Sequence, residues 1–536
     1  MNRAAKQGAV PHPSTRRAFL AQCTAGAWVA TLKHATLRAT DVQSSLQPPV
    51  FRTDHAGLQS QYDAALRGLR ANVVKVFRFG QPVLIEGGGY PGIWLECGPQ
   101  EGLVYGALDL GIARANHEVF FDLQREDGYL PCFVHHGELG SAQIQMVVPI
   151  AATAHELFEQ IHDEAFAIKA YTACSRWDEW LTRYRNTRGT GLCEAFCGFD
   201  TGHDNSPRFK DLPWKCPNND ARICPRAPGL PFLAPDLSAT VFGGRSALAK
   251  MARALGKAAE AGQWEERAEA IREAILARCF DRQDECFYDV DTNNRFVRIK
   301  GDALTRVVGE HVVDQKLFDR LYARHLHNPK EFWAPYPFPS IALNDPAFDH
   351  SLPQNSWGGA SQALTALRAP RWMEHYGKPA PLADLMERWV KALLASGVFR
   401  QQINPWTGAS STGDWYSPAM LVLFDFVGRL YGIRVGREAV EWNCRLPEAA
   451  KSVDYSLPTS RGRARLHTTA AGTELRLGDR RVAQVEGVAR LTTRLDGHAL
   501  SLTGTSPQVS AVRVRCADGR HLEAVLQPDT VVALPQ

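Results

Sequence analysis

The sequence has no marked excess of either charge and no evident phosphate loop. These two absences argue against two classes of function, nucleic-acid binding and nucleotide-dependent catalysis. Its 61 Lys and Arg residues against 57 Asp and Glu residues leave a formal net charge of +4 over 536 residues. No long Lys/Arg run occurs beyond the N-terminus, so a nucleic-acid partner is not expected. No GKS or GKT phosphate loop stands out either, which argues against a nucleotide-dependent enzyme.

A zinc signature is also missing, although the chain contains 12 cysteines. Cys193 and Cys197 have helical i, i+4 spacing, but no Cys-x2-Cys or His-x3-His pair accompanies them. We expect most of the cysteines to be buried free thiols. Two pairs flank polar loops and could form disulfides in an oxidising compartment: Cys216 with Cys224, and Cys279 with Cys286.

Long apolar runs are absent as well, even in the N-terminal segment. This segment carries Ser14-Thr15-Arg16-Arg17-Ala18-Phe19-Leu20, which looks like a twin-arginine export motif, and its apolar part ends near Leu32. It is too short and too rich in small residues to predict a membrane span. We therefore expect a signal over residues 1–39, no stable membrane insertion after its removal, and a mature protein in the periplasm or outside the cell.

What the sequence does contain is helical periodicity over residues 40–440, followed by short strands over residues 450–536. Apolar residues at three- and four-residue spacing predict helices at 153–170, 239–255, 264–278, 302–323, 361–376 and 382–396. Alternation between turn signals predicts strands at 463–469, 473–477, 481–485, 489–495, 500–503, 509–516 and 521–526. The expected fold is mainly α, with a small antiparallel, β-sandwich-like domain at the C-terminal end.

The most polar stretch among the helices is Asp200-Thr201-Gly202-His203-Asp204-Asn205-Ser206-Pro207-Arg208-Phe209. It gathers two carboxylates, an imidazole, an amide and a guanidinium, and its Gly and Pro predict a loop. Taken alone, such a composition is equally typical of a solvated turn. Other long loops, rich in Trp, Pro, Gly and Asn, recur between the helices, and long ordered loops are usually functional. Helix pairs joined by such loops suggest a toroid of helical hairpins with the loops at one mouth.

These loops resemble the motifs of the (α/α)6-barrel glycoside hydrolases, in the group of mannosylglycerate hydrolase, processing α-glucosidase and trehalase (families 63 and 37). Asp200 to Phe209 resembles their Glu-Ser-Gly-x-Asp-Asn-Ser-Pro-Arg-Trp motif. The resemblance continues, in the expected order, in Gln124 to Pro131, Pro337 to Ser340, Ser356 to Gly359 and Asn404 to Gly408. It implies a six-hairpin toroid from about Gly89 to Ile433 and a carbohydrate substrate.

By this resemblance Asp204 takes the place of the general acid. An inverting glycosidase needs a protonated carboxyl at the leaving oxygen and a second carboxylate that activates water, about 6.5–9.5 Å away. Burial or a neighbouring Asp200 would raise the pKa of the acid. Arg208 would bind substrate hydroxyls or support Asp200. The expected substrate-binding residues are Trp94, Asp200, His203, Asn205, Arg208, Trp333, Trp357, Gln401 and Trp415, the tryptophans serving as sugar platforms or as core.

The sequence departs from the family pattern where the catalytic base is expected, because Gln401 stands three residues before Asn404. An amide can hold a water molecule but cannot take its proton at neutral pH. Another carboxylate could serve as the base, and Asp414 and Glu96 rank ahead of Glu194 and Glu101. The chemistry could instead use assistance from the substrate, or the site could bind sugar without hydrolysing it efficiently.

The sequence thus favours an exported glycoside hydrolase that acts on a small glycoside or oligosaccharide, with no cofactor or metal required. One alternative is a catalytically weak carbohydrate-binding protein, which Gln401 supports. Another is a polysaccharide lyase or sugar epimerase on the same toroid, which would need a Tyr or His at the reacting carbon. Asp236 lies at the start of a predicted helix and is interpreted as its N-cap.

Overall fold

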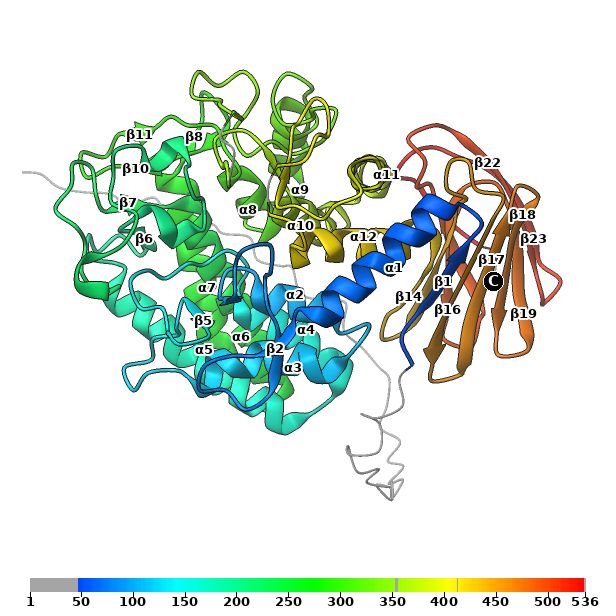
Figure 1. Cartoon of the computed structure of the whole chain (residues 1–536), viewed down its shortest axis with the longest axis horizontal. Coiled ribbons are helices and arrows are strands. Elements are labelled where there is room, and N and C mark those ends of the chain that lie inside the picture. Colours follow the sequence, from blue (N-terminus) through cyan, green and yellow to red (C-terminus); the bar gives the residue numbers. More distant parts are fainter. Residues whose placement is uncertain (1–46, 352–354, 412, 535–536) are drawn as a thin grey trace, which may run out of the picture.

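The computed structural model describes residues 47–351, 355–411 and 413–534, so the predicted export segment lies outside the described residues. A helical body occupies one side of the molecule and an antiparallel sheet region the other (Figure 1). The helices are α1 (Ala56–Ala71), α2 (Gly98–Tyr105), α3 (Leu110–Asp122), α4 (Ile150–Ile161), α5 (Glu164–Tyr184), α6 (Pro235–Ala254), α7 (Ala258–Arg278), α8 (Ala303–Gly309), α9 (Gln315–Leu321), α10 (Ala363–Met373), α11 (Pro379–Ser396) and α12 (Ser417–Tyr431).

Two of the predicted helices are each divided in the structure by a new N-cap. The predicted helix at 153–170 consists of α4 and α5, because His162 adopts a left-handed φ of 51° and Asp163 caps α5. The predicted helix at 302–323 consists of α8 and α9, and Asp314 caps α9. Each Asp accepts a hydrogen bond from the backbone N–H of the third helical residue. The apolar periodicity continues across each cap, so spacing alone predicted one helix where the structure has two.

The sheet region consists of two antiparallel sheets, with strand orders β1-β16-β17-β18-β19-β22-β23 and β14-β15-β20-β21-β24. The seven strands predicted near the C-terminus are all present, as β17 to β23. Five further strands join them: β16 and β24, which also follow residue 450, β14 and β15, which precede it, and β1 from the N-terminal end. The bounds are β1 (Val50–Thr53), β14 (Ile433–Val435), β15 (Ala439–Cys444), β16 (Ser452–Thr459), β17 (Gly462–Thr469), β18 (Gly472–Leu477), β19 (Arg480–Glu486), β20 (Ala489–Arg494), β21 (Ala499–Thr503), β22 (Ser510–Cys516), β23 (His521–Leu526) and β24 (Val531–Ala533).

Short sheets inside the helical body hold the polar loops. They are β2 (Val73–Lys75) with β3 (Pro82–Leu84), β4 (Gly92–Trp94) with β5 (Phe133–His135), β8 (Phe280–Asp281) with β9 (Cys286–Phe287), β12 (Ser361–Gln362) with β13 (Gln402–Ile403), and a four-stranded sheet of β6 (Glu194–Ala195), β7 (Phe232–Leu233), β10 (Asp289–Val290) and β11 (Phe296–Val297). Strand β6 leads into the loop at Asp200, and β13 follows Gln401 directly.

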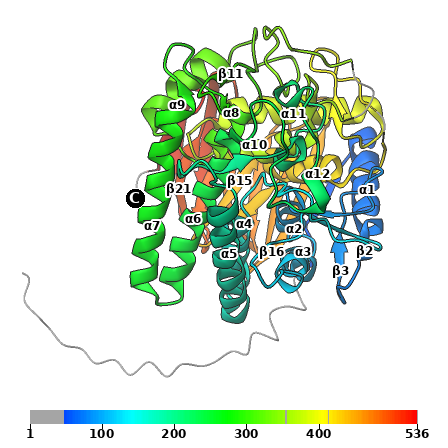
Figure 2. The same cartoon turned by 90° about the vertical axis from the view of Figure 1, so that its left-hand side faces the viewer.

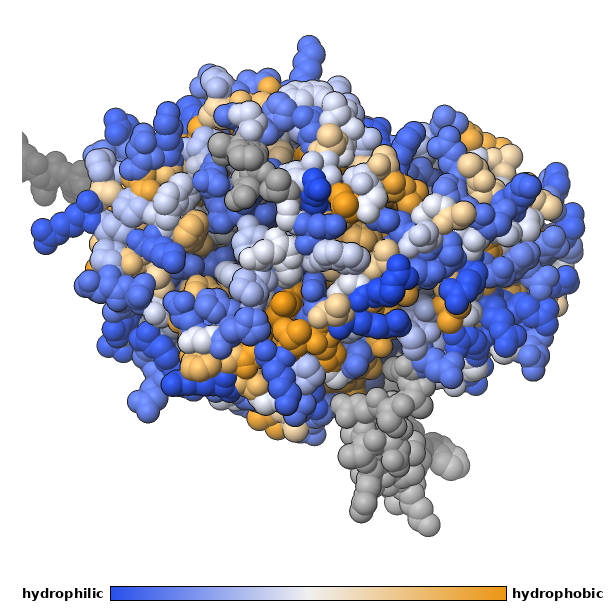
Figure 3. All heavy atoms as spheres, viewed as in Figure 1, coloured by the Kyte–Doolittle hydropathy of each residue, from blue (hydrophilic) through white to orange (hydrophobic). Residues whose placement is uncertain are grey.

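One hydrophobic core runs through both halves of the molecule. Viewed from the helical side, α5, α6 and α7 lie in front of the sheet strands (Figure 2). The face seen in Figure 1 is mostly hydrophilic, with hydrophobic residues gathered in smaller groups (Figure 3). Among the described residues, none of the helices has both the length and the apolar character that crossing a membrane requires.

Candidate active site

The loop from Asp200 to Phe209 is irregular, as predicted, and its turns direct alternate side chains to different surroundings. Two 3-10 turns (Gly198–Thr201 and Pro207–Phe209) enclose it. Gly202 has a φ of 65°, and a Cβ on it would overlap with Glu96 Oε2. Glycine is therefore required here for its conformation and for space. As a result, the Glu96 carboxylate lies against the backbone of the loop.

Asp200 is a fully enclosed support of the loop rather than a substrate contact. Its carboxylate forms a bidentate ion pair with the guanidinium of Arg185, with N–O distances of 2.5 and 3.1 Å. It also accepts hydrogen bonds from the backbone N–H groups of Ile144, Phe196 and Cys197. Both residues of the ion pair are completely buried. The expectation that Asp200 contacts substrate is therefore wrong, because every lone pair of its carboxylate faces a protein donor.

Arg208 is likewise committed to the protein. Its guanidinium donates two hydrogen bonds to Asp236 (2.7 and 3.1 Å) and two to Asp289 (2.8 and 2.7 Å). It supports neither Asp200 nor a substrate hydroxyl, contrary to both expectations. Asp236 is not an N-cap either, because Ala234 occupies that position of α6. The clamp instead ties the loop to α6 and β10.

His203 lies in the same buried network. Arg208 Nη1 donates to His203 Nδ1 over 2.8 Å, so the ring proton sits on Nε2, which lies 3.2 Å from Asp302 Oδ2. Burial, followed by the charge of Arg306, lowers the pKa of His203 to about 3. The imidazole is therefore neutral at physiological pH, and both of its nitrogens are occupied. It is a spacer between ion pairs rather than the predicted substrate contact.

Asp204, in contrast, turns away from these ion pairs. Its carboxyl is hydrogen-bonded to Asn355, whose Nδ2 donates to Asp204 Oδ2 over 2.5 Å. Burial, followed by the charge of Glu96, raises the pKa of Asp204 to about 8, although the hydrogen bond from Asn355 opposes this shift. The carboxyl therefore keeps its proton at neutral pH. This is the state that a general acid needs.

Gln401 is connected to Asp204 through Asn355. Gln401 Nε2 donates to Asn355 Oδ1 over 2.8 Å, and Tyr90 Oη donates to Gln401 Oε1 over 3.1 Å. The hydrogen bonds thus run from Tyr90 through Gln401 and Asn355 to Asp204. The expected base position and the expected acid are therefore brought together, as the resemblance predicted, with an amide where a carboxylate was expected.

Three further carboxyl groups, those of Glu86, Glu96 and Glu101, lie close to one another, and Glu86 and Glu96 also interact electrostatically with Asp204. Burial raises the pKa of Glu101 to about 8 and that of Glu86 well above its usual value. Burial raises the pKa of Glu96 only to about 6, because the nearby charges of Arg306 and Arg368 oppose it. Glu96 is consequently the carboxyl of this group that is mostly ionised at neutral pH. Its Oε2 has no hydrogen-bond partner among the described residues.

Two of the predicted tryptophans lie at this site. The Trp357 backbone N–H donates to the carbonyl of Asp204 over 3.2 Å, and its buried ring lies 4.7 Å from the ring of His203. Trp94 packs against the small hydrophobic cluster that contains Trp357, and its ring meets that of Tyr90 edge-on, with 5.6 Å between the ring centres. Asn205 is exposed, and its amide donates to the carbonyl of Asn355. These residues surround Asp204 with aromatic and amide groups.

The other two predicted tryptophans have different surroundings. Trp333 packs against His327 and Phe338 in a separate group of aromatic side chains. Trp415 is about half exposed, and its ring lies against Gly68 of α1. No contact of either residue with Asp204 or Gln401 occurs in the described part of the chain. The expected role of both as sugar platforms therefore has no geometric support.

The remaining candidate carboxylates are occupied in turns. Asp414 Oδ1 accepts hydrogen bonds from the backbone N–H groups of Phe399 and Trp415, each over 2.8 Å. Glu194 is fully buried and accepts from Thr187 and from the backbone of Arg188. Of the four carboxylates considered from the sequence, Glu96 and Glu101 are thus the two grouped with Asp204.

The sequence interpretation missed Glu86, Tyr90, Asn355 and Arg306. Tyr90 lies at the start of an aromatic loop that was noticed for Trp94 and Glu96, and Asn355 stands two residues before Trp357. Glu86 directly precedes three glycines, which mark a tight loop. Arg306 lies in the helical segment that was predicted as one long helix, and no local pattern singled it out.

Two groups of side chains bring possible metal ligands within 4.8 Å of one another: Glu86, Glu96 and Cys97, and also Cys197, Asp200 and Cys216. In the first group, Glu96 is already influenced by the charges of Arg306 and Arg368. In the second, Arg185 occupies the carboxylate of Asp200. Neither group offers a set of free ligands that would favour a metal ion over its protein partners.

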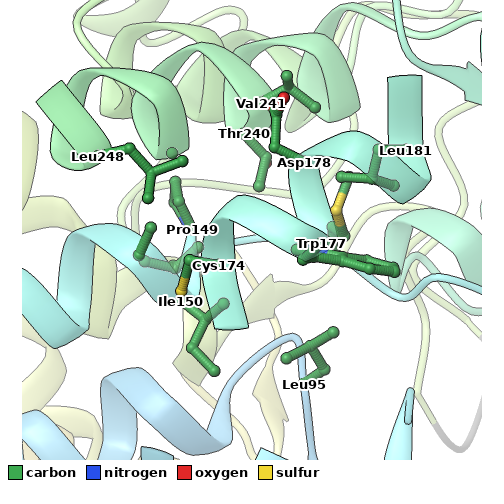
Figure 4. A pocket seen from close by; sticks show the side chains of 14 residues that line it. Leu95, Pro149, Ile150, Cys174, Trp177, Asp178, Leu181, Thr240, Val241 and Leu248 are labelled. Carbon is green, nitrogen blue, oxygen red and sulfur yellow. The ribbon is translucent and has the colours of Figure 1, made fainter. Parts of the chain in front are cut away.

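A cavity of about 30 Å³ lies beside this site, between α4, α5 and α6 (Figure 4). Its walls are mainly apolar, including Ile150, Trp177 and Leu248, and its one carboxylate, Asp178, is bound by Arg245 and Arg267. A sugar ring needs several free hydrogen-bond partners, so this cavity does not suit a carbohydrate. The polar groups around Asp204 do.

The chain is similar to known glycoside hydrolases. The family model described as "Mannosylglycerate hydrolase MGH1-like glycoside hydrolase domain" matches residues 104–417. The GH63 mannosylglycerate hydrolase from Thermus thermophilus, solved in complex with glucose, has a TM-score of 0.57 at 19% identity, over 68% of this chain and 99% of that chain. Neutral trehalase from Saccharomyces cerevisiae has a TM-score of 0.52 at 13% identity, over 68% and 80%. The GH78 family rhamnosidase of Bacillus sp. GL1 has a TM-score of 0.54 at 13% identity, over 82% and 40%.

The fold and these similarities define a helical glycoside hydrolase of the GH63 type, with a separate antiparallel sheet region. Because the family model covers more than half of the chain, the chain belongs to the mannosylglycerate hydrolase MGH1-like glycoside hydrolase family. The suspected group is thereby confirmed, and the protein is a glycosidase. This family membership favours hydrolysis over the lyase and epimerase alternatives.

Proposed function

We propose that the protein hydrolyses a small glycoside or oligosaccharide with inversion at the anomeric carbon, and that Asp204 is the general acid. The observation that carries the proposal is the environment of Asp204, a carboxyl whose pKa is about 8 and whose hydrogen-bond partner belongs to a chain of amides. At neutral pH it holds the proton that the leaving oxygen requires. We also propose that the helices form the (α/α)6 toroid of the family.

Glu96 is the proposed base. Two carboxyls whose surroundings push their pKa values apart are the usual sign of an acid and base pair. Here burial and Glu96 raise the pKa of Asp204 to about 8, while Arg306 and Arg368 limit the pKa of Glu96 to about 6. Glu86 and Glu101 are weaker candidates, because burial raises the pKa of Glu101 to about 8 and that of Glu86 well above its usual value. Asp414 is a weaker candidate, because its carboxylate holds two backbone N–H groups.

Gln401 is proposed to position the attacking water rather than deprotonate it. Its amide is held from both sides, by Tyr90 at the oxygen and by Asn355 at the nitrogen. Trp94 and Trp357 are proposed to contact the sugar ring, and the exposed amide of Asn205 a hydroxyl. The relative from Thermus thermophilus is a mannosylglycerate hydrolase, so mannosylglycerate is the first substrate to test here.

A hydrolysis screen tests this proposal directly. The purified protein would meet mannosylglycerate, trehalose, glucobioses and rhamnosides beside the Asp204→Asn and Glu96→Gln variants. We expect turnover in the parent and loss of at least ~100-fold in each variant, because each lacks one proton-transfer group. The anomer that forms first, followed by NMR, should be the inverted one. Turnover that survives in Asp204→Asn would remove Asp204 from its proposed role.

A second candidate function is sugar binding without efficient hydrolysis, which the amide at position 401 favours. In that case the parent would bind a sugar of the panel in calorimetry but release no product over hours. Binding would then survive in Asp204→Asn with little change in affinity. The two candidates therefore differ in a single assay series.

Export by the twin-arginine route is proposed separately, from the motif at Arg16 and Arg17. We expect the chain in the periplasmic fraction of a bacterium with this pathway. Changing both arginines to lysine should leave it in the cytoplasm. Equal export of the parent and the double variant would contradict this route.

A further inference from the structure

Two cysteine thiols lie face to face directly behind the candidate active-site loop. Cys197 Sγ and Cys216 Sγ are 3.8 Å apart, and both residues are buried. In residues 47–351, 355–411 and 413–534 this is the one sulfur–sulfur contact within hydrogen-bonding range, and all eleven described cysteines are free thiols. Phe196 and the half-buried Cys224 complete the cluster. No step of the proposed hydrolysis uses these thiols.

The surrounding backbone holds the two thiols in place. The Gly198 N–H donates to the carbonyl of Pro213 over 3.0 Å, and the Phe199 N–H donates to that of Trp214 over 3.1 Å. These hydrogen bonds keep the segments that carry Cys197 and Cys216 side by side. A disulfide has an S–S distance of about 2.05 Å. The two sulfurs would thus need to approach each other by under ~2 Å in total, shared between two loop residues.

The segment that such a bond would enclose is the functional loop itself. Residues 198–215 contain the whole stretch from Asp200 to Phe209, including Asp204. The thiols also touch the support of that loop. Arg185 Nη2 lies 3.8 Å from Cys216 Sγ, and the Cys197 N–H donates to Asp200 Oδ2. A bond between the two sulfurs would therefore close a ring around the loop next to its main ion pair.

We propose that Cys197 and Cys216 are a dithiol modification site, which a disulfide oxidant such as glutathione disulfide closes into an intramolecular bond. One protein thiolate attacks the oxidant, forming a mixed disulfide and releasing one glutathione thiol. The second protein thiolate then attacks the mixed disulfide, forming the Cys197–Cys216 bond and releasing the second glutathione thiol. The two electrons and two protons lost by the cysteines thus appear in the two glutathione molecules.

This pairing differs from the one that the sequence suggested, because Cys216 meets Cys197 rather than Cys224. Cys224 lies in the same cluster but points to the carbonyl of Pro225, with its Sγ 3.6 Å from that oxygen. In the other suggested pair, Cys279 Sγ contacts the carbonyl of Leu233 and Cys286 Sγ contacts that of Phe287, rather than each other. The proposed pairing thus gives Cys216 a different partner from the one that linear proximity across a loop suggested.

The test uses the full-length protein, incubated with glutathione disulfide or with dithiothreitol. After unfolding and alkylation, we expect the oxidised sample to lose two reactive thiols, and peptide mapping to find Cys197 linked to Cys216. The thermal midpoint should rise by roughly 3 °C, because the bond restricts the unfolded chain. Dithiothreitol should reverse both changes.

Cys197→Ser should abolish the thiol loss and the thermal shift, whereas Cys279→Ser, a buried cysteine outside the cluster, should retain both. A Cys216–Cys224 link, a glutathione adduct that persists without closure, or an unchanged thiol count in the parent would each overturn the proposal. The mapping of the parent protein decides the matter even if a variant fails to fold. The result is independent of whether Asp204 is the acid.

Discussion

Three neighbouring carboxylates show how surroundings, rather than residue type, set the role of an acidic side chain. Asp200 faces Arg185 and three backbone N–H groups, so protein donors occupy its carboxylate completely. Asp204 faces an amide and other carboxyls, so it keeps its proton at neutral pH. Glu96 lies between these extremes, with cationic groups nearby but no direct partner for one oxygen among the described residues. An acid and base pair needs environments like those of Asp204 and Glu96, and not one like that of Asp200.

The pH dependence of hydrolysis should follow these two pKa values. Asp204 must be protonated, so kcat/KM should fall as the pH rises through about 8. Glu96 must be ionised, so kcat/KM should also fall as the pH drops through about 6. Asn355→Ala removes a hydrogen bond that favours the ionised form of Asp204, so the alkaline limb should move to higher pH.

The control for this shift is Asn293→Ala, an exposed turn residue whose loss should leave both limbs in place. Measurement of kcat/KM across both limbs with one substrate is sufficient. An alkaline limb that stays fixed or moves to lower pH in Asn355→Ala would contradict the coupling between Asn355 and Asp204.

Gln401→Glu places a carboxylate at the position where the sequence resemblance led us to expect the base. Because Glu96 is the proposed base, we expect no gain in kcat/KM from this variant. A gain of at least ~10-fold would contradict that assignment, since a general base contributes ~10²–10⁴-fold in favourable geometry. Tyr90 can still donate to the new carboxylate, while Asn355 would have to turn its amide.

Gln401→Ala is the matched variant for this experiment, since it removes the amide without adding a carboxylate, and it should be slower than the parent. If Gln401→Glu brings no gain while Gln401→Ala loses activity, the water is deprotonated elsewhere. That outcome would strengthen the assignment of Glu96.

At this scale the sequence predicted which segments meet but not which side chains face the site. Asp204, Glu96, Trp357 and Gln401 were named and do lie together. Asp200, His203 and Arg208 stand in the same motif yet point into buried ion pairs. Of their partners, Asp236 of α6, Asp289 of β10 and Asp302 just before α8 are far away in the sequence, so no local pattern could reveal them.

At the scale of elements, the loop depends on a glycine whose missing side chain leaves room for Glu96. Gly202→Ala would combine a strained φ of 65° with a Cβ that overlaps Glu96 Oε2. Gly189 has nearly the same φ, 64°, but nothing within 4 Å of a Cβ. We expect Gly189→Ala to cost about 1 kcal/mol of unfolding free energy from backbone strain.

Gly202→Ala should cost about 2–4 kcal/mol, because overpacking adds to the strain. It should also lower activity by more than ~100-fold through the displaced Glu96. Urea unfolding and kcat/KM measure the two effects. Equal losses of unfolding free energy in Gly202→Ala and Gly189→Ala would mean that the overlap with Glu96 adds nothing to the cost of backbone strain.

The Arg208 clamp joins three elements of the body and should dominate their stability. Replacing Arg208 with Met leaves Asp236 and Asp289 as buried carboxylates without their common partner. Breaking a buried ion pair in this way typically costs about 3–5 kcal/mol. The ion pair of the exposed Arg295 with Asp291 offers the comparison, since Arg295→Met should cost under ~1 kcal/mol. Denaturant midpoints measure both, and similar costs would refute the clamp.

Helices and strands were predictable to different degrees for physical reasons. Of the strands after residue 450, β16 and β24 were missed. The other seven alternate clearly between turn signals, and each was predicted close to its observed bounds. The strand β1 was not, because its partner β16 follows it by about 400 residues. Apolar spacing predicted where helices lie. It did not predict the breaks before α5 and α9, because these depend on the N-caps Asp163 and Asp314 and the apolar spacing continues across them.

At the scale of the whole molecule, the helical body and the sheet region are built into each other. The first strand pairs with β16, and Phe51 on it packs on Tyr62 of α1. Tyr455 covers Gly428 and Gly432 at the end of α12. Arg490 of β20 forms a two-pronged ion pair with Glu374, just after α10. These contacts place the N-terminal strand and both ends of the helical body against the sheets (Figure 1).

A chain that ends at Glu448 should therefore fail to give a stable body, although the similarity to the Thermus thermophilus enzyme covers 99% of that chain and only 68% of this one. The truncation removes β16, which pairs with β1, and β20, which pairs with β15. The edges of β1 and β15 and the side chain of Phe51 would then be uncovered. We expect an insoluble product or a thermal midpoint at least ~10 °C below that of the parent. The control is the full chain with a protease site in the exposed turn at Glu448, which should remain assembled and nearly as stable after cleavage. A soluble truncated chain with the parent's midpoint would mean that the sheets are accessory, and that the helical body of this protein is as self-sufficient as that of its shorter relative.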